Sequence, residues 1–349
     1  MIKLTNLSAV GLMILTSVTC YAEPKTVVVS ADGKGDFKTV QEAIAAVPEN
    51  NADRTIVQIK PGQYTGPVVI PKTKPHITLL GENAETTVIS WAHNVYDPAP
   101  EGSNSMNPGL LVNGDDFQAV GVTIENTAGD HGQALAVMVN SDRCLFLSCR
   151  LLGWQDTLMI NGGRDYFRDC YIAGRVDFIY GSATAWFQDC EIHSRNGGHV
   201  TAASTPEDHE FGFVFDHCKL TGDKTAWDPA TTNPSTTVKP KVTPKADLGR
   251  PWRAYASVTY LQCDMGDHIT PEGWNNWRKE SNEKTARYSE YKSTGPGGAS
   301  DKRVAWSHQL TDEQAAAITV TRVLGGNDQW DPVAALNAPP KVEAAKLSK

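Results

Sequence analysis

Two aspartates occur at the same place in two similar segments of the chain. Asp156 lies in GWQDTL at 153–158 and Asp177 lies in GRVDFIYG at 174–181, and each follows a cysteine by seven residues. If the segments are consecutive units of a structural repeat, their carboxylates occupy equivalent positions. Two carboxylates held close together do not ionise together easily, so one keeps its proton while the other stays charged.

The spacing of the pair predicts how close the two carboxylates lie. Asp156 and Asp177 are 21 residues apart, which is one coil of a β-solenoid. Adjacent strands of a sheet are about 4.8 Å apart. At about 5 Å, two unit charges repel by about 3 kcal/mol at an effective dielectric constant of about 20. The pair could therefore serve as a proton donor and a nucleophile, although the spacing does not say which residue has which role.

Two glutamines share the same one-coil relation. Gln133 and Gln155 are 22 residues apart, so we expect their amides to stack beside the aspartates. An amide N–H can donate to an oxyanion that develops during a reaction. Arg250, in LGRPW at 248–252, would supply a cation that keeps one aspartate ionised. Spacing alone leaves a structural role open, because Asp in turns and Gln on solenoid faces are often structural.

Apolar side chains accompany this polar set. Trp252 and Tyr180 offer flat faces on which a sugar ring could stack. Phe178 and Met159, which lie in the two aspartate segments, are further candidates for substrate binding. A sugar ring is therefore one ligand that such a surface could hold.

One short pattern recurs from residue 117 onward. It consists of an apolar residue, two variable positions, a cysteine (Gly121 in the first copy) and alternating apolar residues. Repeats of about 20–30 residues made of short strands indicate a β-solenoid. We expect an all-β fold, a right-handed parallel β-helix with about three strands per coil, because the consensus of a leucine-rich horseshoe is missing. The copies are FQAVGVTIE at 117–125, LFLSCRLLG at 145–153, YFRDCYIAG at 166–174, WFQDCEIHS at 186–194, VFDHCKLTG at 214–222 and TYLQCDMGD at 259–267.

Short helices are expected at both ends of the repeats. Thr39 begins a capping box (TVQE), and apolar residues then recur at helical spacing until Pro48. A second capping box, TDEQ at 311–314, begins a helix that we expect to end at glycines 325–326. Each helix would cover part of the solenoid.

The pattern indicates one domain. We interpret residues 23–336 as a single β-helix domain, because the repeats resume after the long inserted loop at 223–247. The tail at 337–349 is rich in Ala, Pro and Lys, and we expect it to be disordered.

The first 22 residues have the features of a secretory signal peptide. Lys3 precedes an apolar run at 9–15, and a small-residue exit follows at 20–22. A lipoprotein anchor on Cys20 is an alternative, although residues 17–19 lack the leucine and the small residue that such a site prefers. We therefore expect a secreted protein, or a periplasmic one in a Gram-negative cell.

Six cysteines remain beyond this segment, and five of them occupy the cysteine position of the repeat. Cysteine is small, apolar and readily buried, so we expect the five to stack inside the coils. Cys170 and Cys190, one coil apart, are the pair best placed for a disulfide, although parallel Cβ vectors would strain the bond.

Several function classes find no support. The formal net charge of -8 argues against nucleic acid as a partner, and no second apolar run suggests a membrane span. No GxSxG motif indicates a serine hydrolase. His193 and His199 lack the spacing of a zinc site. We expect a monomer without a metal or cofactor.

Five motifs together resemble the signature set of the pectin methylesterases, the pectinesterases of carbohydrate esterase family 8. They are GWQDTL, GRVDFIYG, LGRPW, QALAV at 133–137 and DGKGDFKTVQEAI at 32–44, and EYKSTGPG at 290–297 and the TDEQAA segment extend the resemblance to nearly all of the mature chain. It implies a right-handed parallel β-helix enzyme that hydrolyses galacturonate methyl esters in homogalacturonan, the polysaccharide of pectin, and releases methanol.

The resemblance also implies a role for each polar residue. Asp177 would be the nucleophile that attacks the ester carbonyl, and Asp156 would protonate the leaving methanol and then deprotonate water. Gln133 and Gln155 would stabilise the oxyanion, and Arg250 would hydrogen-bond to Asp177 and hold it charged.

One departure concerns substrate contact, and two other readings stay open. Many family members have an aromatic residue where this chain has Met159, which leaves the preference of that subsite undetermined.

A glycoside hydrolase or lyase acting on polygalacturonate could use the same scaffold, since two close carboxylates also suit a retaining glycosidase. The chain could also be an esterase or binding protein for another carbohydrate ester.

Overall fold

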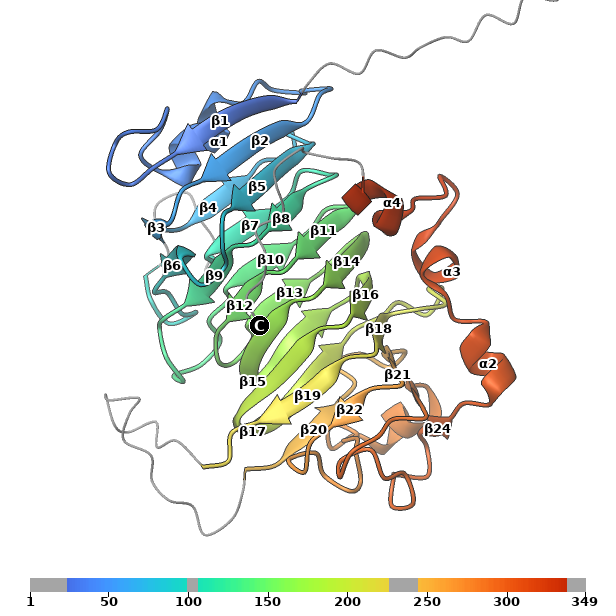
Figure 1. Cartoon of the computed structure of the whole chain (residues 1–349). Helices are drawn as coiled ribbons and strands as arrows, with labels where there is room; N and C mark the ends of the chain where they lie inside the picture. Colours follow the sequence, from blue (N-terminus) through green and yellow to red (C-terminus); the bar gives the residue numbers. More distant parts are fainter. Residues whose placement is uncertain (1–23, 99–105, 226–243, 338–349) are drawn as a thin grey trace, which may run out of the picture.

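A computed structural model describes residues 24–98, 106–225 and 244–337 of the chain. Figure 1 shows parallel strands stacked coil upon coil, with one short helix near the N-terminal strands and three along one side of the stack. The expected all-β parallel β-helix is confirmed. The proposed signal peptide, most of the inserted loop and nearly all of the C-terminal tail lie outside the described residues.

The first face of the β-helix is an eleven-stranded parallel sheet. Its strands pair in chain order, one from each coil, because each coil places its strand beside the one before. In that order they are β1 (Lys25–Val29), β2 (Thr55–Ile59), β5 (Ile77–Gly81), β8 (Gln118–Val120), β11 (Cys144–Leu147), β14 (Arg164–Arg168), β16 (Thr184–Gln188), β18 (Phe213–Asp216), β21 (Ser257–Leu261), β23 (Arg287–Tyr291) and β24 (His308–Gln309).

Two more faces complete each coil, and long strands join them at the centre. β15 (Tyr171–Gly181) and β17 (Glu191–Ala203) run around the corner, so that each pairs with strands of both faces. The second face also holds β3 (Gly62–Thr65), β6 (Thr87–Trp91), β9 (Thr123–Asn126), β12 (Arg150–Leu152), β19 (Lys219–Gly222) and β22 (Asp264–Met265). The third holds β4 (Val68–Ile70), β7 (Leu110–Val112), β10 (Val137–Val139), β13 (Leu158–Ile160) and β20 (Ala246–Gly249).

The interior contains the predicted stack of cysteines and, beside it, a ladder of aromatic rings that was not predicted. One aromatic residue from each of the last five copies stacks on the next, and the ring centroids of Phe146, Phe167, Phe187, Phe215 and Tyr260 are 4.5–4.8 Å apart. Such spacing is that of successive strands in a sheet, so the register of the coils aligns the rings. The five cysteines of the pattern are also buried.

A disulfide between Cys170 and Cys190 is not formed, and both residues are buried free thiols. Each Sγ lies within hydrogen-bonding distance of backbone carbonyl oxygens. In-register stacking directs neighbouring Cβ atoms alike, which is unfavourable for a disulfide. The cysteines therefore act as small core residues.

The first copy of the pattern is offset by one residue from our alignment. Strand register places Val122, not Gly121, opposite Cys149, because Thr123 pairs with Arg150. Gly121 occupies the turn position instead, with φ of 61°. Ser148 takes the same left-handed conformation before Cys149, and glycine adopts it at little cost.

The helices match the expectation at the N-terminus and differ at the C-terminus. α1 (Val40–Ala46) begins at the Thr39 capping box. The single helix expected after TDEQ is two helices, α2 (Asp312–Ala316) and α3 (Val320–Leu324), because Thr319 is extended and caps a second start. A further helix, α4 (Pro332–Asn337), was not expected.

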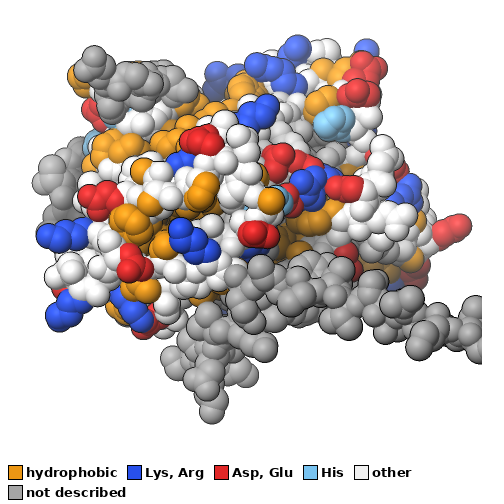
Figure 2. All heavy atoms as spheres, turned by 90° about the horizontal axis from the view of Figure 1, so that it is seen from above, with side chains coloured by type: hydrophobic (Ala, Val, Ile, Leu, Met, Phe, Trp, Pro, Cys, Tyr) orange, Lys and Arg blue, Asp and Glu red, His pale blue; other side chains and the backbone are white. Residues whose placement is uncertain are grey.

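These C-terminal helices cover part of the outer surface of the first sheet (Figure 1). Val323 and Leu324 pack against the outward-facing Leu145, Tyr166 and Trp186. The face seen from above in Figure 2 carries acidic and basic side chains side by side, without a large area of one sign.

Candidate active site

Each aspartate segment begins with a glycine for the same steric reason. Gly153 and Gly174 lie four residues before Thr157 and Phe178, whose side chains fill the space that a Cβ at the glycine would occupy. A larger residue at either glycine would displace the residue that follows the aspartate. The repeated glycine thus positions the two aspartates alike on consecutive coils.

The two aspartates are neighbours, as their spacing predicts. Leu158 pairs with Ile179 across the coils, which gives Asp156 and Asp177 equivalent positions. Both are left-handed, with φ of 63° and 54°, and aspartate tolerates this conformation better than most residues. The exposed fractions of the residues are only 5% and 7%. Their carboxylates are therefore close together and shielded from water.

Arg250 holds Asp177 with two hydrogen bonds. Its Nε donates to Oδ1 and its Nη2 donates to Oδ2 of Asp177, both at 2.8 Å. Arg250 directly follows β20, which pairs with β17, the strand beside β15. A bidentate pair of charge-assisted hydrogen bonds is the strongest arrangement of an arginine with a carboxylate, and it fixes the orientation of the Asp177 side chain.

Asp156 has the properties of a proton donor. Burial, followed by the charge of Asp177, raises the pKa of Asp156 from 3.8 to about 7. The side chains of Tyr180 and Gln155 and the charge of Arg250 act in the opposite direction and are weaker. Burial and the nearby Asp156 carboxyl also raise the pKa of Tyr180. At neutral pH, Asp156 therefore exchanges its proton readily.

The raised pKa predicts a pH-dependent effect on stability. Between about pH 4 and 7 the folded protein retains a proton on Asp156 that the unfolded chain has lost, so the stability contribution of this group falls as pH rises. Asp156→Asn removes the ionisable group, so the stability of this variant should not show the fall with pH that Asp156 causes. We expect its free energy of unfolding to match the wild type near pH 4 and to exceed it by up to about 4 kcal/mol at pH 8. Urea unfolding at both pH values measures this, and a difference that does not change with pH would contradict it.

The two glutamines lie where the sequence predicts. Gln133 and Gln155 form a parallel bridge between consecutive coils, and the backbone N–H of Ala134 donates to the carbonyl oxygen of Gln155. Gln155 immediately precedes Asp156. Its side chain also affects the pKa of Asp156, so an amide donor is next to the carboxylate pair.

Apolar side chains form a cluster on the outer surface beside the aspartates. Leu135, Met159, Tyr180 and Ala202 form its buried part, and Trp252 packs against them. The rings of Tyr180 and Trp252 meet edge to face, with centroids 5.8 Å apart. Three of the four substrate-binding candidates therefore lie together.

The prediction that Phe178 contacts substrate is wrong, because Phe178 does not belong to this surface. Its exposed fraction is 0% and it packs in the main core. The left-handed turn at Asp177 directs both Phe178 and Ile179 inward, which simple alternation along a strand does not anticipate. Phe178 supports the site from below and cannot contact a substrate.

Two further residues of this surface were missed by sequence reasoning. Met138 pairs with Met159 on the next coil and belongs to the same cluster. Trp277 also packs there, and the guanidinium of Arg250 lies 3.8 Å from the centre of its ring. Strand register could have identified Met138, whereas Trp277 lies in a loop without a repeat.

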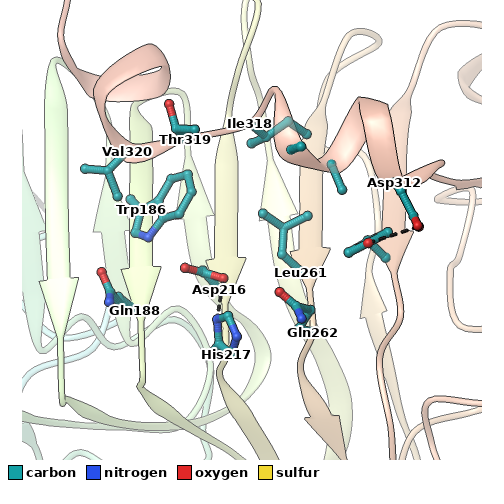
Figure 3. A pocket seen from close by; sticks show the side chains of 13 residues that line it. Trp186, Gln188, Asp216, His217, Leu261, Gln262, Asp312, Ile318, Thr319 and Val320 are labelled. Atoms are coloured by element: carbon teal, nitrogen blue, oxygen red, sulfur yellow. Dashed lines mark hydrogen bonds and ion pairs between the residues drawn. The ribbon is translucent and has the colours of Figure 1, made fainter.

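A separate pocket of about 520 Å³ lies between the C-terminal helices and the first sheet. In Figure 3, Trp186 and Leu261 are beneath the helical segment, and Asp216 hydrogen-bonds to His217. None of the residues that line it belongs to the aspartate site. We therefore place the candidate active site at the aspartates.

The part of the chain that the structure describes contains neither a grouped set of metal ligands nor a helix that could cross a membrane. Within residues 24–98, 106–225 and 244–337, no three His, Cys, Asp or Glu residues are grouped to hold a metal ion. In the same ranges, no helix has the length and apolar character needed to cross a membrane.

Known structures share this fold. Pectin methylesterase from carrot superposes with a TM-score of 0.79 at 34% identity, covering 91% of this chain and 98% of the carrot chain. PemA, a pectin methylesterase from Erwinia chrysanthemi, has a TM-score of 0.72 at 29% identity, covering 89% of this chain and 99% of its own. A pectin methylesterase solved with a hexasaccharide has a TM-score of 0.71 at 29% identity, with coverage of 89% and 99%.

Sequence comparison agrees with the structural match. Pectinesterase 31 of Arabidopsis thaliana is 39% identical over 307 residues, which span 84% of this chain and 90% of the relative. The sequence model described as Pectinesterase matches residues 26–327, from the first strand to beyond α3. Because this match includes both aspartate segments and most of the chain, the protein belongs to the pectinesterase family.

Proposed function

We propose that this pectinesterase hydrolyses the galacturonate methyl esters of homogalacturonan through a covalent aspartyl intermediate. The observation that carries the proposal is the asymmetry of the pair: Arg250 binds Asp177 with two hydrogen bonds, while the pKa of Asp156 is raised to about 7. One carboxylate is thereby suited to attack, and the other to donate a proton.

In the first half of the reaction, a carboxylate oxygen of Asp177 attacks the ester carbonyl carbon. The carbonyl oxygen becomes an oxyanion, to which the amides of Gln133 and Gln155 donate. The proton of Asp156 passes to the methoxy oxygen as the carbon–oxygen bond breaks, and methanol leaves. The galacturonyl group is then joined to Asp177 as an acyl anhydride.

In the second half, Asp156 has lost its proton and can act as a base. It accepts a proton from water, whose oxygen attacks the acyl carbon, and the same glutamines stabilise the second oxyanion. Collapse of this intermediate releases the galacturonate product and the Asp177 carboxylate, to which Arg250 again donates. Asp156 is left protonated, so the site returns to its starting state.

The apolar cluster at Met159, Tyr180 and Trp252 is our proposal for the surface that receives the sugar chain. Flat aromatic rings pack against the apolar faces of sugars. The relative solved with a hexasaccharide supports an oligosaccharide as the ligand. Met159 supplies a flexible apolar contact at a position where a ring would impose a fixed orientation.

Parallel assays of two products test the proposed reaction. Purified protein incubated with partly methylated homogalacturonan, which contains both esterified and free galacturonate, should release methanol without a rise in reducing ends. A glycoside hydrolase or a lyase would instead shorten the polymer, and an esterase for another sugar ester would release no methanol from this substrate. Reducing ends without methanol would reject the pectinesterase mechanism.

We also propose that residues 1–22 direct secretion and that residues 23–336 form one catalytic domain. The supporting features are Lys3 and the apolar run at 9–15. Expression in a secreting host should give mature protein in the medium or the periplasm whose N-terminal sequence begins at Glu23. Recovery of the intact N-terminus from the cytosol would contradict this, and attachment of lipid to Cys20 would support the lipoprotein alternative.

A further inference from the structure

The guanidinium of Arg250 makes two kinds of contact, one with the carboxylate of Asp177 and one with the ring of Trp277. The proposed mechanism uses only the contact with Asp177. Its edge donates to both oxygens of Asp177. One of its flat faces lies over the ring of Trp277, with the guanidinium carbon 3.8 Å from the ring centroid. A cation over an indole face is attracted by the negative potential of the ring, and tryptophan is the strongest partner for this contact.

Trp277 is itself held by its loop. Its backbone is left-handed, with φ of 61°, which is uncommon for a bulky residue. Its backbone N–H donates to Oδ1 of Asn275 at 2.8 Å. Its ring packs against the apolar cluster beside the aspartates. The ring is therefore presented to Arg250 from a fixed position.

A buried asparagine ties this loop to the segment that carries Arg250. Nδ2 of Asn282 donates to the carbonyl oxygen of Asn276, next to Trp277, and to that of Pro251, next to Arg250. The exposed fraction of Asn282 is 3%. One side chain thus connects the loop of the ring with the loop of the cation, which keeps the two in register.

We propose that Trp277 is a positioning residue for the reaction, acting through Arg250. An arginine side chain has several rotatable bonds, and only one orientation of its planar group allows both hydrogen bonds to Asp177. The ring of Trp277 lies against the guanidinium in that orientation and shields the side that it covers from water. This inference rests on the proposed function, because it assumes that the Asp177 carboxylate performs the attack.

Three substitutions separate this role from simple packing. Trp277→Leu keeps an apolar side chain but removes the aromatic face, whereas Trp277→Phe keeps a face. We expect the leucine variant to lose about tenfold in kcat, with KM changed by less than about twofold, and the phenylalanine variant to remain within about threefold of wild type. Trp330→Leu is the matched control, because it removes a similar contact with Arg164 far from the aspartates. It should leave kcat unchanged.

A double-mutant cycle gives a readout that a structural role would not produce. In an Arg250→Lys background the planar group is absent, so Trp277→Leu should reduce kcat by less than about twofold. Equal losses in both backgrounds, equal losses for leucine and phenylalanine, or a rise in KM without a fall in kcat would each overturn the proposal. If the leucine variant unfolds in a thermal melt, Trp277→Met replaces it.

The same experiments distinguish failure of this inference from failure of the proposed function. Methanol release by the wild-type protein tests the function, and the ratios among the variants test the role of Trp277. Wild-type activity with no difference between Trp277→Leu and wild type rejects only the positioning role. Absence of methanol release by folded wild-type protein rejects the reaction on which both rest.

Discussion

Asp177→Ala is expected to lower kcat for methanol release by at least about 10⁴-fold while the β-helix stays folded. The substitution removes the atom that attacks the ester and leaves Arg250 without its carboxylate partner. Asp156 cannot replace it, because Asp156 must deliver a proton in the same step. Methanol release under saturating substrate measures the loss, and far-ultraviolet circular dichroism checks the fold.

A matched control for this substitution is Asp189→Ala. Asp189 has nearly the same backbone conformation as Asp177, with φ of 53° against 54°, but it is exposed on another turn of the solenoid. Replacing aspartate by alanine in a left-handed turn costs about 1 kcal/mol of stability at either site. Only Asp177→Ala should abolish activity. If Asp177→Ala kept near wild-type turnover, Asp177 could not be the nucleophile.

Asp156→Asn is expected to lower kcat on methyl esters by about 10³-fold or more, and to spare acylation by an activated ester. Methoxide is a poor leaving group that needs the proton of Asp156, whereas nitrophenolate leaves without one. With a nitrophenyl ester of galacturonate, the variant should release one equivalent of nitrophenol per enzyme in a burst and then stall. The stall follows because the base for the second half of the reaction is absent.

The wild-type pH profile provides a second check on the same residue. Since the free enzyme needs Asp156 protonated, and its pKa is about 7, kcat/KM on methyl esters should fall as pH rises through that value. The rate of acylation of Asp156→Asn by the nitrophenyl ester should not fall as pH rises through that value. If the variant showed no burst, or if its acylation rate still fell as pH rose through about 7, Asp156 would not be the general acid.

Prediction from sequence succeeded where the fold is periodic. A parallel β-helix places equivalent residues of consecutive coils about one strand spacing apart. The intervals from Asp156 to Asp177 and from Gln133 to Gln155 were therefore enough to bring each pair together. The same periodicity predicted that the five cysteines of the pattern would stack inside the coils, and all five are buried.

Prediction failed where local geometry interrupts the period. The left-handed residue at Asp177 directs Phe178 into the core, so this ring does not bind substrate. Thr319 divides the expected C-terminal helix because its side chain caps a new first turn. Cys170 and Cys190 stack without bonding, since strand register controls the distance between cysteines but not the direction of their side chains.

The aspartate pair depends partly on the order of residues in the chain and partly on the fold. The sequence by itself determined that Asp156 and Asp177 would be neighbours, because 21 residues make one coil. The contacts that make the two aspartates differ come only from the tertiary structure. Arg250 reaches Asp177 from a later coil, its contact with Trp277 joins two loops, and burial raises the pKa of Asp156. Burial and contacts between distant loops depend on the packed molecule, so no interval in the sequence encodes them.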